Sequence, residues 1–280
     1  MNRVFFHIHI WKTGGTSFFN ICRENFGKGF HRDIMLIQDW FLSNQQLRWL
    51  LDYHYWVRCY SCHMLSGDLP YDVSGTEVIG IAFVRNPVNR FVSSYNSARG
   101  DNYQGGIAKD TNFDDFYVKA LVDVVNPMWR NGQTFVLGGS GTETGLVRIS
   151  ERVRNGQIVL LPTERFDESC ILLERLFPND FKDCSYTRYN VSKRGEAITE
   201  YQRTAISQYM DIDFKLLTLA NDYLDSTLDR LFPDPNERQQ YIDNFRHRCK
   251  LKKRRQRVTY VVKYMDRSIK TLLRKMTNFT

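Results

Sequence analysis

The chain has no long apolar run, and this absence limits what it can be. Its first apolar stretch, VFFHIHI at residues 4–10, is short and contains two histidines, whereas a membrane-spanning helix needs about 20 consecutive apolar residues. The sequence also lacks the charged start and apolar middle of a secretory signal peptide. We therefore expect a soluble, cytoplasmic protein.

Cysteines are few and irregularly spaced. The 280 residues contain six of them, which excludes the dense disulfide framework of small secreted domains. Cys59 and Cys62 form a C-x-x-C motif followed by His63, with His54 nearby, but a structural zinc site ordinarily needs a second such pair. The sequence has no second pair, so we expect reduced thiols in a strand and no metal site.

Acidic residues are missing from a segment near the C-terminus. Residues 246–257, RHRCKLKKRRQR, contain eight Lys or Arg residues and no Asp or Glu, in a chain whose net charge is +8. Apolar residues then recur at helical spacing, which predicts a basic amphipathic helix. Such a helix could lie on an anionic membrane, hold an acidic acceptor, or pack back on the body. The apolar positions are Val258, Val261, Val262, Met265, Ile269, Leu272 and Leu273.

The remaining sequence predicts a parallel α/β fold. Hydrophobic residues make up 42% of the chain and aromatic residues 14%, enough for a packed core. Strands are expected at 4–10, 57–65, 77–84 and 157–162. Helices are expected from Thr16 or Ser17 to about Asn25 and at 44–55, 86–98, 166–177 and 196–232, and a mobile loop at 100–115. Alternating strands and helices give βαβ units. We expect a three-layer domain over residues 1–232 and a basic helical extension over residues 233–280.

The loop after the first strand is typical of an anion site. It reads WKTGGTS at residues 11–17, and helix N-termini with glycine-rich loops bind phosphate groups. Its lysine precedes the glycines, whereas the Walker A lysine follows them. Taken alone, the pattern also fits an ordinary glycine turn with a capped helix. The candidate anion-binding residues are Lys12, Thr13, Gly14, Gly15, Thr16 and Ser17.

A second anion site follows the strand at 77–84. That strand ends in Arg85, where many P-loop kinases and ATPases have the aspartate that organises Mg²⁺. Arginine suits bidentate contact with a phosphate, and Ser93 follows two turns along the next helix. Two anion sites without a metal carboxylate predict a metal-independent enzyme whose ligand carries two separated phosphate-like groups.

These motifs resemble the P-loop-like sulfotransferases, most closely the carbohydrate branch that includes heparan sulfate 2-O- and chondroitin sulfotransferases. WKTGGTS looks like the family's 5′-phosphosulfate loop, and VRNPVNRFVSSY like its 3′-phosphate motif, with Arg85 and Ser93 at the matching places. LPTERFDESCILLERLF, residues 161–177, is similar to a strand and helix of the same branch, and NGQTFVLGG (131–139) and YTRYNVSKR (186–194) match more weakly. Trp11 departs from the branch, which usually has proline there, and Cys62 stands where many relatives have glycine.

The resemblance implies a three-layer P-loop-like domain that uses 3′-phosphoadenosine 5′-phosphosulfate. A sulfuryl group would pass in line to an acceptor hydroxyl. The resemblance favours a carbohydrate hydroxyl, on a glycan or a glycolipid, and leaves a small metabolite or a protein tyrosine as alternatives. Lys12 would stabilise charge on the leaving oxygen, and His63 would be the general base, with His9 or a carboxylate as the alternative. The alternative hypotheses for the function are a basic polyanion-binding protein without catalysis and a nucleotide-dependent kinase. No specific nucleic acid is expected as a partner.

Several other residues have simpler roles in this interpretation. His7 and His9 are expected to be hydrogen-bonded histidines of the sheet. Three tryptophans are expected in the core or in a pocket wall, namely Trp40, Trp49 and Trp56. Glu164 and Arg165 are expected to form an ion pair that shapes the site.

Overall fold

The computed structural model describes residues 2–32, 41–100, 112–122, 128–187 and 198–277, and leaves aside the side chains of residues 98–100, 119 and 257–277. Its centre is a five-stranded sheet with the order β2-β3-β1-β4-β5, in which every paired strand is parallel to its neighbour. This confirms the predicted parallel α/β fold. The strands are β1 (Asn2–Ile8), β2 (Phe30–Arg32), β3 (Cys59–Cys62), β4 (Thr76–Val84) and β5 (Ile158–Pro162).

The two central strands, β1 and β4, are apolar over most of their length. In β4, TEVIGIAFV, the last seven residues are buried, as expected for a strand that helices cover on both faces. In the register, Ile8 lies opposite both Cys62 of β3 and Ala82 of β4. The carboxyl ends of these three strands therefore reach the same edge of the sheet.

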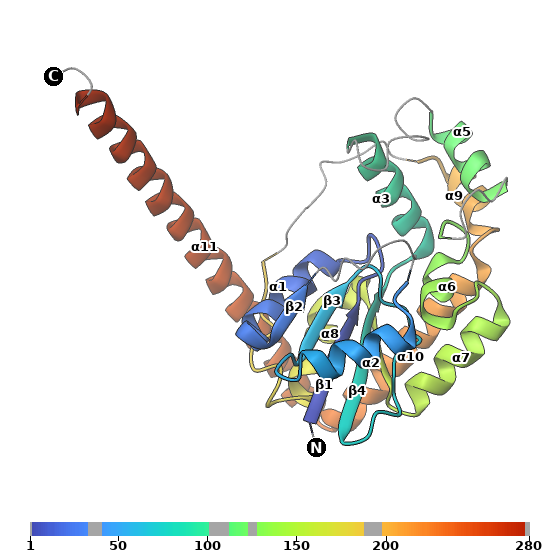
Figure 1. The fold of residues 1–280 in the computed structure, drawn as a ribbon. Coiled ribbons are helices and arrows are strands. Elements are labelled where there is room, and N and C mark those ends of the chain that lie inside the picture. The colour runs from blue at the N-terminus through green and yellow to red at the C-terminus, as the bar shows by residue number, and fades with distance from the viewer. Residues whose placement is uncertain (1, 33–40, 101–111, 123–127, 188–197, 278–280) are drawn as a thin grey trace.

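Helices cover both faces of the sheet, giving the three predicted layers (Figure 1). On one face α2 (Asn44–Tyr53), α6 (Gly132–Gly138) and α7 (Glu143–Arg154) contribute to the core. On the other lie α1 (Gly15–Phe26), α8 (Phe166–Leu176) and the first turns of α11 (Pro235–Thr277). Helix α10 (Asp211–Leu231) crosses the β5 edge, because Leu216 packs into the first face and Leu224 into the second.

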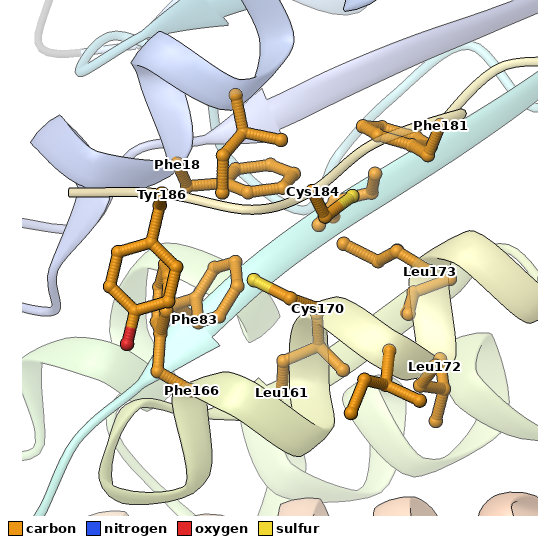
Figure 2. Close-up of a cluster of buried hydrophobic side chains, with 14 of the residues drawn as sticks. Phe18, Phe83, Leu161, Phe166, Cys170, Leu172, Leu173, Phe181, Cys184 and Tyr186 are labelled. Atoms are coloured by element: carbon orange, nitrogen blue, oxygen red, sulfur yellow. The ribbon is translucent and has the colours of Figure 1, made fainter. Parts of the chain in front are cut away.

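Figure 2 shows part of the core on the second face. Phe18 of α1 and Phe83 of β4 have ring centroids 4.9 Å apart, and Phe83 also packs on Phe166 of α8 at 4.8 Å. Tyr186 packs edge-on against Phe166 at 4.7 Å. This cluster fixes α1 and α8 against the strands that carry the candidate site.

A smaller cluster lies beside the sheet, around Phe91, Tyr95 and Phe116. Its helices are α3 (Pro87–Gly100), α5 (Phe113–Tyr117), the π-helix η2 (Val118–Val122) and α9 (Glu200–Ser207). Two short 3₁₀ turns complete the described elements, η1 (Gly27–Gly29) and η3 (Thr163–Arg165).

Several predicted boundaries were wrong. The strand expected at 57–65 covers only Cys59–Cys62, and the helical stretch expected at 196–232 is two helices, α9 and α10. Helix α1 begins at Gly15, with Gly14 in a left-handed conformation as its N-cap and no side-chain cap. Thr16 and Ser17 therefore lie inside the helix and do not cap it. Most of the loop expected at 100–115 lies outside the described residues.

The C-terminal extension is helical, as predicted, and α11 runs from Pro235 to Thr277. Its first turns belong to the body, because Ile242 and Phe245 are buried in the second core cluster. Farther along, the helix leaves the body (Figure 1). Among the described helices, none is long and apolar enough to cross a membrane. The faces of the helix beyond Gln256, and with them the predicted apolar stripe, lie outside the described side chains.

Candidate active site

The first candidate anion site is the loop between β1 and α1. Its backbone passes through left-handed conformations at Lys12, with φ 66°, and at Gly14, with φ 81°. Such a conformation costs a residue with a side chain about 1–2 kcal/mol, so a lysine at this position is conformationally strained. Strain of this kind concentrates at functional sites. Helix α1 begins at Gly15, directly after these residues, and a helix N-terminus offers backbone N–H groups and a positive dipole end to an anion.

The two glycines of the loop are required for different reasons. Gly14 needs its left-handed φ, which glycine adopts without strain. At Gly15 a Cβ atom would lie 1.9 Å from Cδ2 of His9. The imidazole of His9 therefore occupies the space that a side chain would need, and the second glycine brings α1 against this histidine.

Three hydrogen bonds hold the loop in place. Thr13 Oγ1 donates to the carbonyl of Ile10 at 2.8 Å, and Thr163 Oγ1, after β5, donates to the carbonyl of Thr13 at 2.7 Å. Arg85 Nη1, after β4, donates to the carbonyl of Lys12 at 3.0 Å. Because the Thr13 hydroxyl hydrogen is used within the loop, the backbone N–H is what Thr13 can offer to an anion. Thr16 is exposed and Ser17 is largely buried.

The second candidate anion site rests on a buried glutamine. Gln133 of α6 accepts a hydrogen bond from the backbone N–H of Arg85 at 2.8 Å and donates from Nε2 to the Arg85 carbonyl at 2.9 Å. Its amide thus fixes both backbone polar groups at the end of β4. Burial lowers the pKa of the Arg85 guanidinium, and Glu164 partly offsets this effect. Arginine still carries its charge under such conditions.

A buried carboxylate holds that glutamine. Asp213 of α10 accepts hydrogen bonds from Gln133 N at 3.2 Å, Thr134 N at 2.8 Å and Thr134 Oγ1 at 2.8 Å. Arg90 of α3 lies 3.9 Å from the same carboxylate, measured from Nη2 to Oδ2. Burial lowers the pKa of Arg90, and Asp213 opposes the change. The buried charge of Asp213 is therefore compensated, as a buried carboxylate requires.

The expected Glu164–Arg165 ion pair was wrong. Arg165 forms ion pairs with Glu168 and Asp225, both at 2.7 Å, and its hydrogen bonds to Glu168 raise its pKa. Glu164 instead accepts a hydrogen bond from the backbone N–H of Asn86 at 2.9 Å. It lies beside the second candidate anion site, and its charge partly offsets the effect of burial on the pKa of Arg85.

Ser93 lies in the second turn of α3 and is partly buried. Arg85 precedes the same helix and is also partly buried. That the two residues share one anion stays a prediction.

His63, the predicted base, is the first residue after β3, and its side chain is exposed. Its Nδ1 lies 2.6 Å from the carbonyl oxygen of His9. A carbonyl oxygen only accepts hydrogen bonds, so Nδ1 carries the proton and Nε2 is the basic nitrogen. The ring stacks on His9 with centroids 3.9 Å apart, and Trp11 packs edge-on against it at 5.4 Å.

His7 and His9 extend this stack into the sheet. Their ring centroids are 4.9 Å apart, and His7 Nδ1 is hydrogen-bonded to Ser61 Oγ at 2.7 Å. Burial, with a smaller effect from His63, lowers the pKa of His9 to about 3. Burial likewise lowers the pKa of His7 well below its ordinary value. Both rings are therefore neutral at physiological pH, and His7 has the hydrogen-bonded role expected of it.

The C-x-x-C motif is not a zinc site. Cys59 packs into the core on one face of the sheet and Cys62 into the core on the other, so the two thiols cannot bind one ion. None of the six cysteines, all of which lie in the described part of the chain, forms a disulfide, and burial raises the pKa of Cys22, Cys170 and Cys184. Reduced, structural thiols agree with the sequence interpretation.

Two of the tryptophans lie outside the core. Trp49 and Trp56 are about half exposed, at 54% and 52% of their surface, so the core position expected for them was wrong, and the pocket-wall alternative stays a prediction. Trp40 lies outside the described residues. Trp11, in contrast, is 36% exposed and lies beside His63.

The structure thus gathers the loop, Arg85 and His63 at one edge of the sheet, where open α/β sheets bind ligands. His9 links His63 to Gly15, and Arg85 links the second site to Lys12. Sequence reasoning missed the supporting roles of Thr163, Gln133 and Asp213. Gln133 lies in the NGQTFVLGG segment, whose polar start is the one signal that could have identified it.

No model of a known protein family matches the chain, and no curated protein matches it by sequence. Among solved structures, a sulfotransferase from Alicyclobacillus acidocaldarius is similar, with a TM-score of 0.49 and 12% sequence identity. The match covers 79% of this chain and 96% of that one. At this identity and score, the likeness says nothing about what this chain binds.

Proposed function

We propose that this chain is a sulfotransferase that moves a sulfuryl group from 3′-phosphoadenosine 5′-phosphosulfate to a hydroxyl group of a carbohydrate, without a metal ion. The observation that carries the proposal is the hydrogen bond from Arg85 to the Lys12 carbonyl. It joins two cationic sites on neighbouring strands, as a ligand with two separate phosphate-like groups would require. The resemblance of both motifs to that family adds to this support.

The site residues have distinct roles in the proposed reaction. The loop N–H groups and α1 hold the 5′-phosphosulfate, and Arg85 with Ser93 holds the 3′-phosphate. The acceptor oxygen bonds to sulfur while the bond from sulfur to the 5′-phosphate oxygen breaks. Lys12 stabilises the charge that develops on that oxygen, and adenosine 3′,5′-bisphosphate leaves. Most of the rate then comes from positioning and electrostatics.

His63 takes the proton of the acceptor hydroxyl on Nε2. The hydrogen bond from Nδ1 to the His9 carbonyl fixes the tautomer that this role needs. Because His9 is neutral, with a pKa near 3, it can stack on His63 without opposing the positive charge that His63 acquires. His9 is itself too weakly basic for the role, which argues against it as the alternative base.

The exposed indole of Trp11 supports a carbohydrate acceptor. It lies edge-on to His63, at a centroid distance of 5.4 Å. A sugar ring can pack its C–H face on a flat apolar ring while its hydroxyl groups point away from that ring. Tryptophan suits such sites because it is apolar over most of its ring and polar at one end. A glycan or a glycolipid headgroup would present the same chemistry here.

The proposal is tested with donor carrying radioactive sulfur and a panel of glycans and glycolipids, with and without a chelator. We expect label transfer that the chelator leaves unchanged, and calorimetric binding of adenosine 3′,5′-bisphosphate. Absence of both transfer and bisphosphate binding would overturn the proposal. Phosphoryl transfer from ATP that needs Mg²⁺ would favour the kinase.

A further inference from the structure

The turn after β5 reaches across the carboxyl edge of the sheet. Strand β4 lies between β5 and β1, yet Thr163 of η3 donates a hydrogen bond of 2.7 Å from Oγ1 to the carbonyl oxygen of Thr13, in the loop after β1. The methyl group of Thr163 contacts the same loop, because its Cγ2 lies 3.2 Å from the position that a Cβ atom at Gly14 would take. Both branches of this side chain therefore hold the first candidate anion site.

The next residue of η3 contacts the second candidate anion site. Glu164 accepts a hydrogen bond on Oε1 from the backbone N–H of Asn86 at 2.9 Å. Asn86 directly follows Arg85, and its own Oδ1 accepts a hydrogen bond from the backbone N–H of Asn89 at 3.0 Å, at the start of α3. Two consecutive residues of one short turn are thus bonded to two different anion sites.

A third contact joins the two sites directly. Arg85 donates from Nη1 to the carbonyl oxygen of Lys12 at 3.0 Å. The loop after β1, the segment after β4 and η3 are therefore each hydrogen-bonded to the other two. Three segments that are joined in pairs keep fixed separations, whereas two segments joined by one contact can still rotate about it.

The turn η3 is itself fixed in the core. Ser169 of α8 donates from Oγ to the carbonyl oxygen of Pro162 at 3.1 Å, and Arg165 forms ion pairs of 2.7 Å with carboxylates of α8 and α10. The following residue, Phe166, packs on Phe83 of β4 with ring centroids 4.8 Å apart (Figure 2). Both anion sites are therefore attached to a rigid part of the fold, as precise positioning of a ligand requires.

We infer that Thr163 and Glu164 are positioning residues that set the distance between the two anion sites, and thereby select a nucleotide with phosphate groups at its 3′ and 5′ positions. This inference rests on the proposed function and deepens it. A ligand with two anionic groups gains most affinity when both sites are held at the matching separation before it binds. A looser separation therefore weakens binding of the matching isomer more than binding of an isomer with a different spacing.

The test compares adenosine 3′,5′-bisphosphate with adenosine 2′,5′-bisphosphate, which has the same groups and charge but another spacing. Thr163→Val keeps the size of the side chain and removes the hydrogen bond to the buried Thr13. By calorimetry, we expect the preference for the 3′,5′ isomer to fall by about fivefold or more. Thr163→Ser, which keeps the hydroxyl, should retain most of the preference. The matched control is Thr218→Val, which removes a hydrogen bond of 3.2 Å from Thr218 Oγ1 to the carbonyl of Phe214 within α10, and it should keep the preference of the parent.

A second pair of variants tests Glu164 at constant charge. Glu164→Gln and Glu164→Ala both remove one negative charge, but glutamine keeps an acceptor for the N–H of Asn86 and alanine does not. We expect the glutamine variant to prefer the 3′,5′ isomer more strongly than the alanine variant does. Because Glu164 is exposed, this pair decides the question if Thr163→Val does not fold.

Amide hydrogen exchange over residues 11–17 gives a measurement that needs no nucleotide. Exchange there should be faster in Thr163→Val than in the parent, and unchanged in Thr218→Val. A parent chain that binds neither isomer would contradict the proposed function. If the parent prefers the 3′,5′ isomer, the same preference in Thr163→Val and in Glu164→Ala would overturn the inference alone. An equal loss of affinity for both isomers would also overturn it, because a general loss of structure would have that effect.

Discussion

The guanidinium of Arg85 donates a hydrogen bond to the carbonyl oxygen of Lys12 at 3.0 Å. Arg85 directly follows β4 and Lys12 lies in the loop after β1, so this contact ties together loops from neighbouring strands. It also fixes the peptide of a lysine whose backbone is left-handed. The two candidate anion sites are therefore parts of one unit, and a change at either should affect both.

The first prediction concerns donor binding. Arg85→Ala and Ser93→Ala should each weaken the affinity for adenosine 3′,5′-bisphosphate by roughly 1.5–3 kcal/mol, the range of a hydrogen bond to a charged group. Calorimetric titration measures the effect. Arg85→Lys is the control for charge, since it keeps the cation and loses the fork that reaches both the anion and Lys12. Unchanged affinity in both alanine variants would remove these residues from the donor site.

The second prediction separates two effects of Lys12, its contribution to turnover and the backbone strain that its side chain causes. Lys12→Ala should lower turnover more than nucleotide affinity, because the lysine acts on charge that develops in the transition state. Lys12→Gly should lose turnover as well, yet raise the free energy of unfolding by about 1 kcal/mol, since glycine adopts a φ of 66° without strain. Steady-state kinetics and urea unfolding test the pair. A fully active alanine variant would exclude Lys12 from the reaction.

The sequence allowed the sheet to be predicted because its central strands are nearly continuous apolar runs. The short, continuous apolar run of β4, rich in β-branched residues, predicts a buried strand. The end of β3 was harder to predict. Residues 63–65, HML, are apolar enough to continue a strand, but the chain turns after Cys62 and the strand ends there. The exposure of Trp49 was foreseeable: Leu47 and Leu50 point α2 into the core, and Trp49 lies between them on the outer side.

The candidate site was predictable wherever a residue follows a strand. Parallel strands bring their carboxyl ends to one edge, so the loop, His63 and Arg85 had to lie close together. Gln133 and Asp213 had no such signal. They are separated by 80 positions, and a polar residue within a helical stretch does not reveal that it is buried or what it contacts.

The third prediction tests whether Gln133 positions Arg85. Gln133→Leu removes both hydrogen bonds to the Arg85 backbone and should weaken nucleotide binding by about 1.4 kcal/mol, roughly tenfold. Because its effect passes through Arg85, it should add little in a chain that already carries Arg85→Ala. Thr134→Val is the matched control, since it removes a hydrogen bond to the same Asp213 and should reduce stability without changing affinity. Additive losses in the double variant would contradict a positioning role.

The fourth prediction concerns the stability of the fold at acidic pH. The pKa of His9 is about 3 in the folded chain, below its ordinary 6.5, and that of His7 is lowered too. As the pH falls below 6.5, the unfolded chain binds protons that the folded chain does not. The free energy of unfolding is therefore greatest above that pH. As the pH falls further, each of the two histidines should lower it by about 1.4 kcal/mol per pH unit.

Urea unfolding at about pH 7, 6 and 5 measures this slope before most carboxylates titrate. His9→Phe keeps a ring beside Gly15 and His63 but cannot take up a proton. It should make the slope clearly shallower than that of the parent. A variant with the parent's slope would show that His9 does not control the acid response.

The fifth prediction concerns the base. His63→Ala should lower sulfuryl transfer by about 10²- to 10⁴-fold, the usual contribution of a general base, with nucleotide affinity retained. Trp11→Ala is the comparison, because it should raise KM for the glycan and leave the pH dependence of transfer unchanged. Imidazole added to His63→Ala should restore part of the transfer, which a purely structural role would not allow. Near-normal transfer by His63→Ala across the pH range would assign proton removal to a carboxylate, because His9 is too weakly basic to replace it.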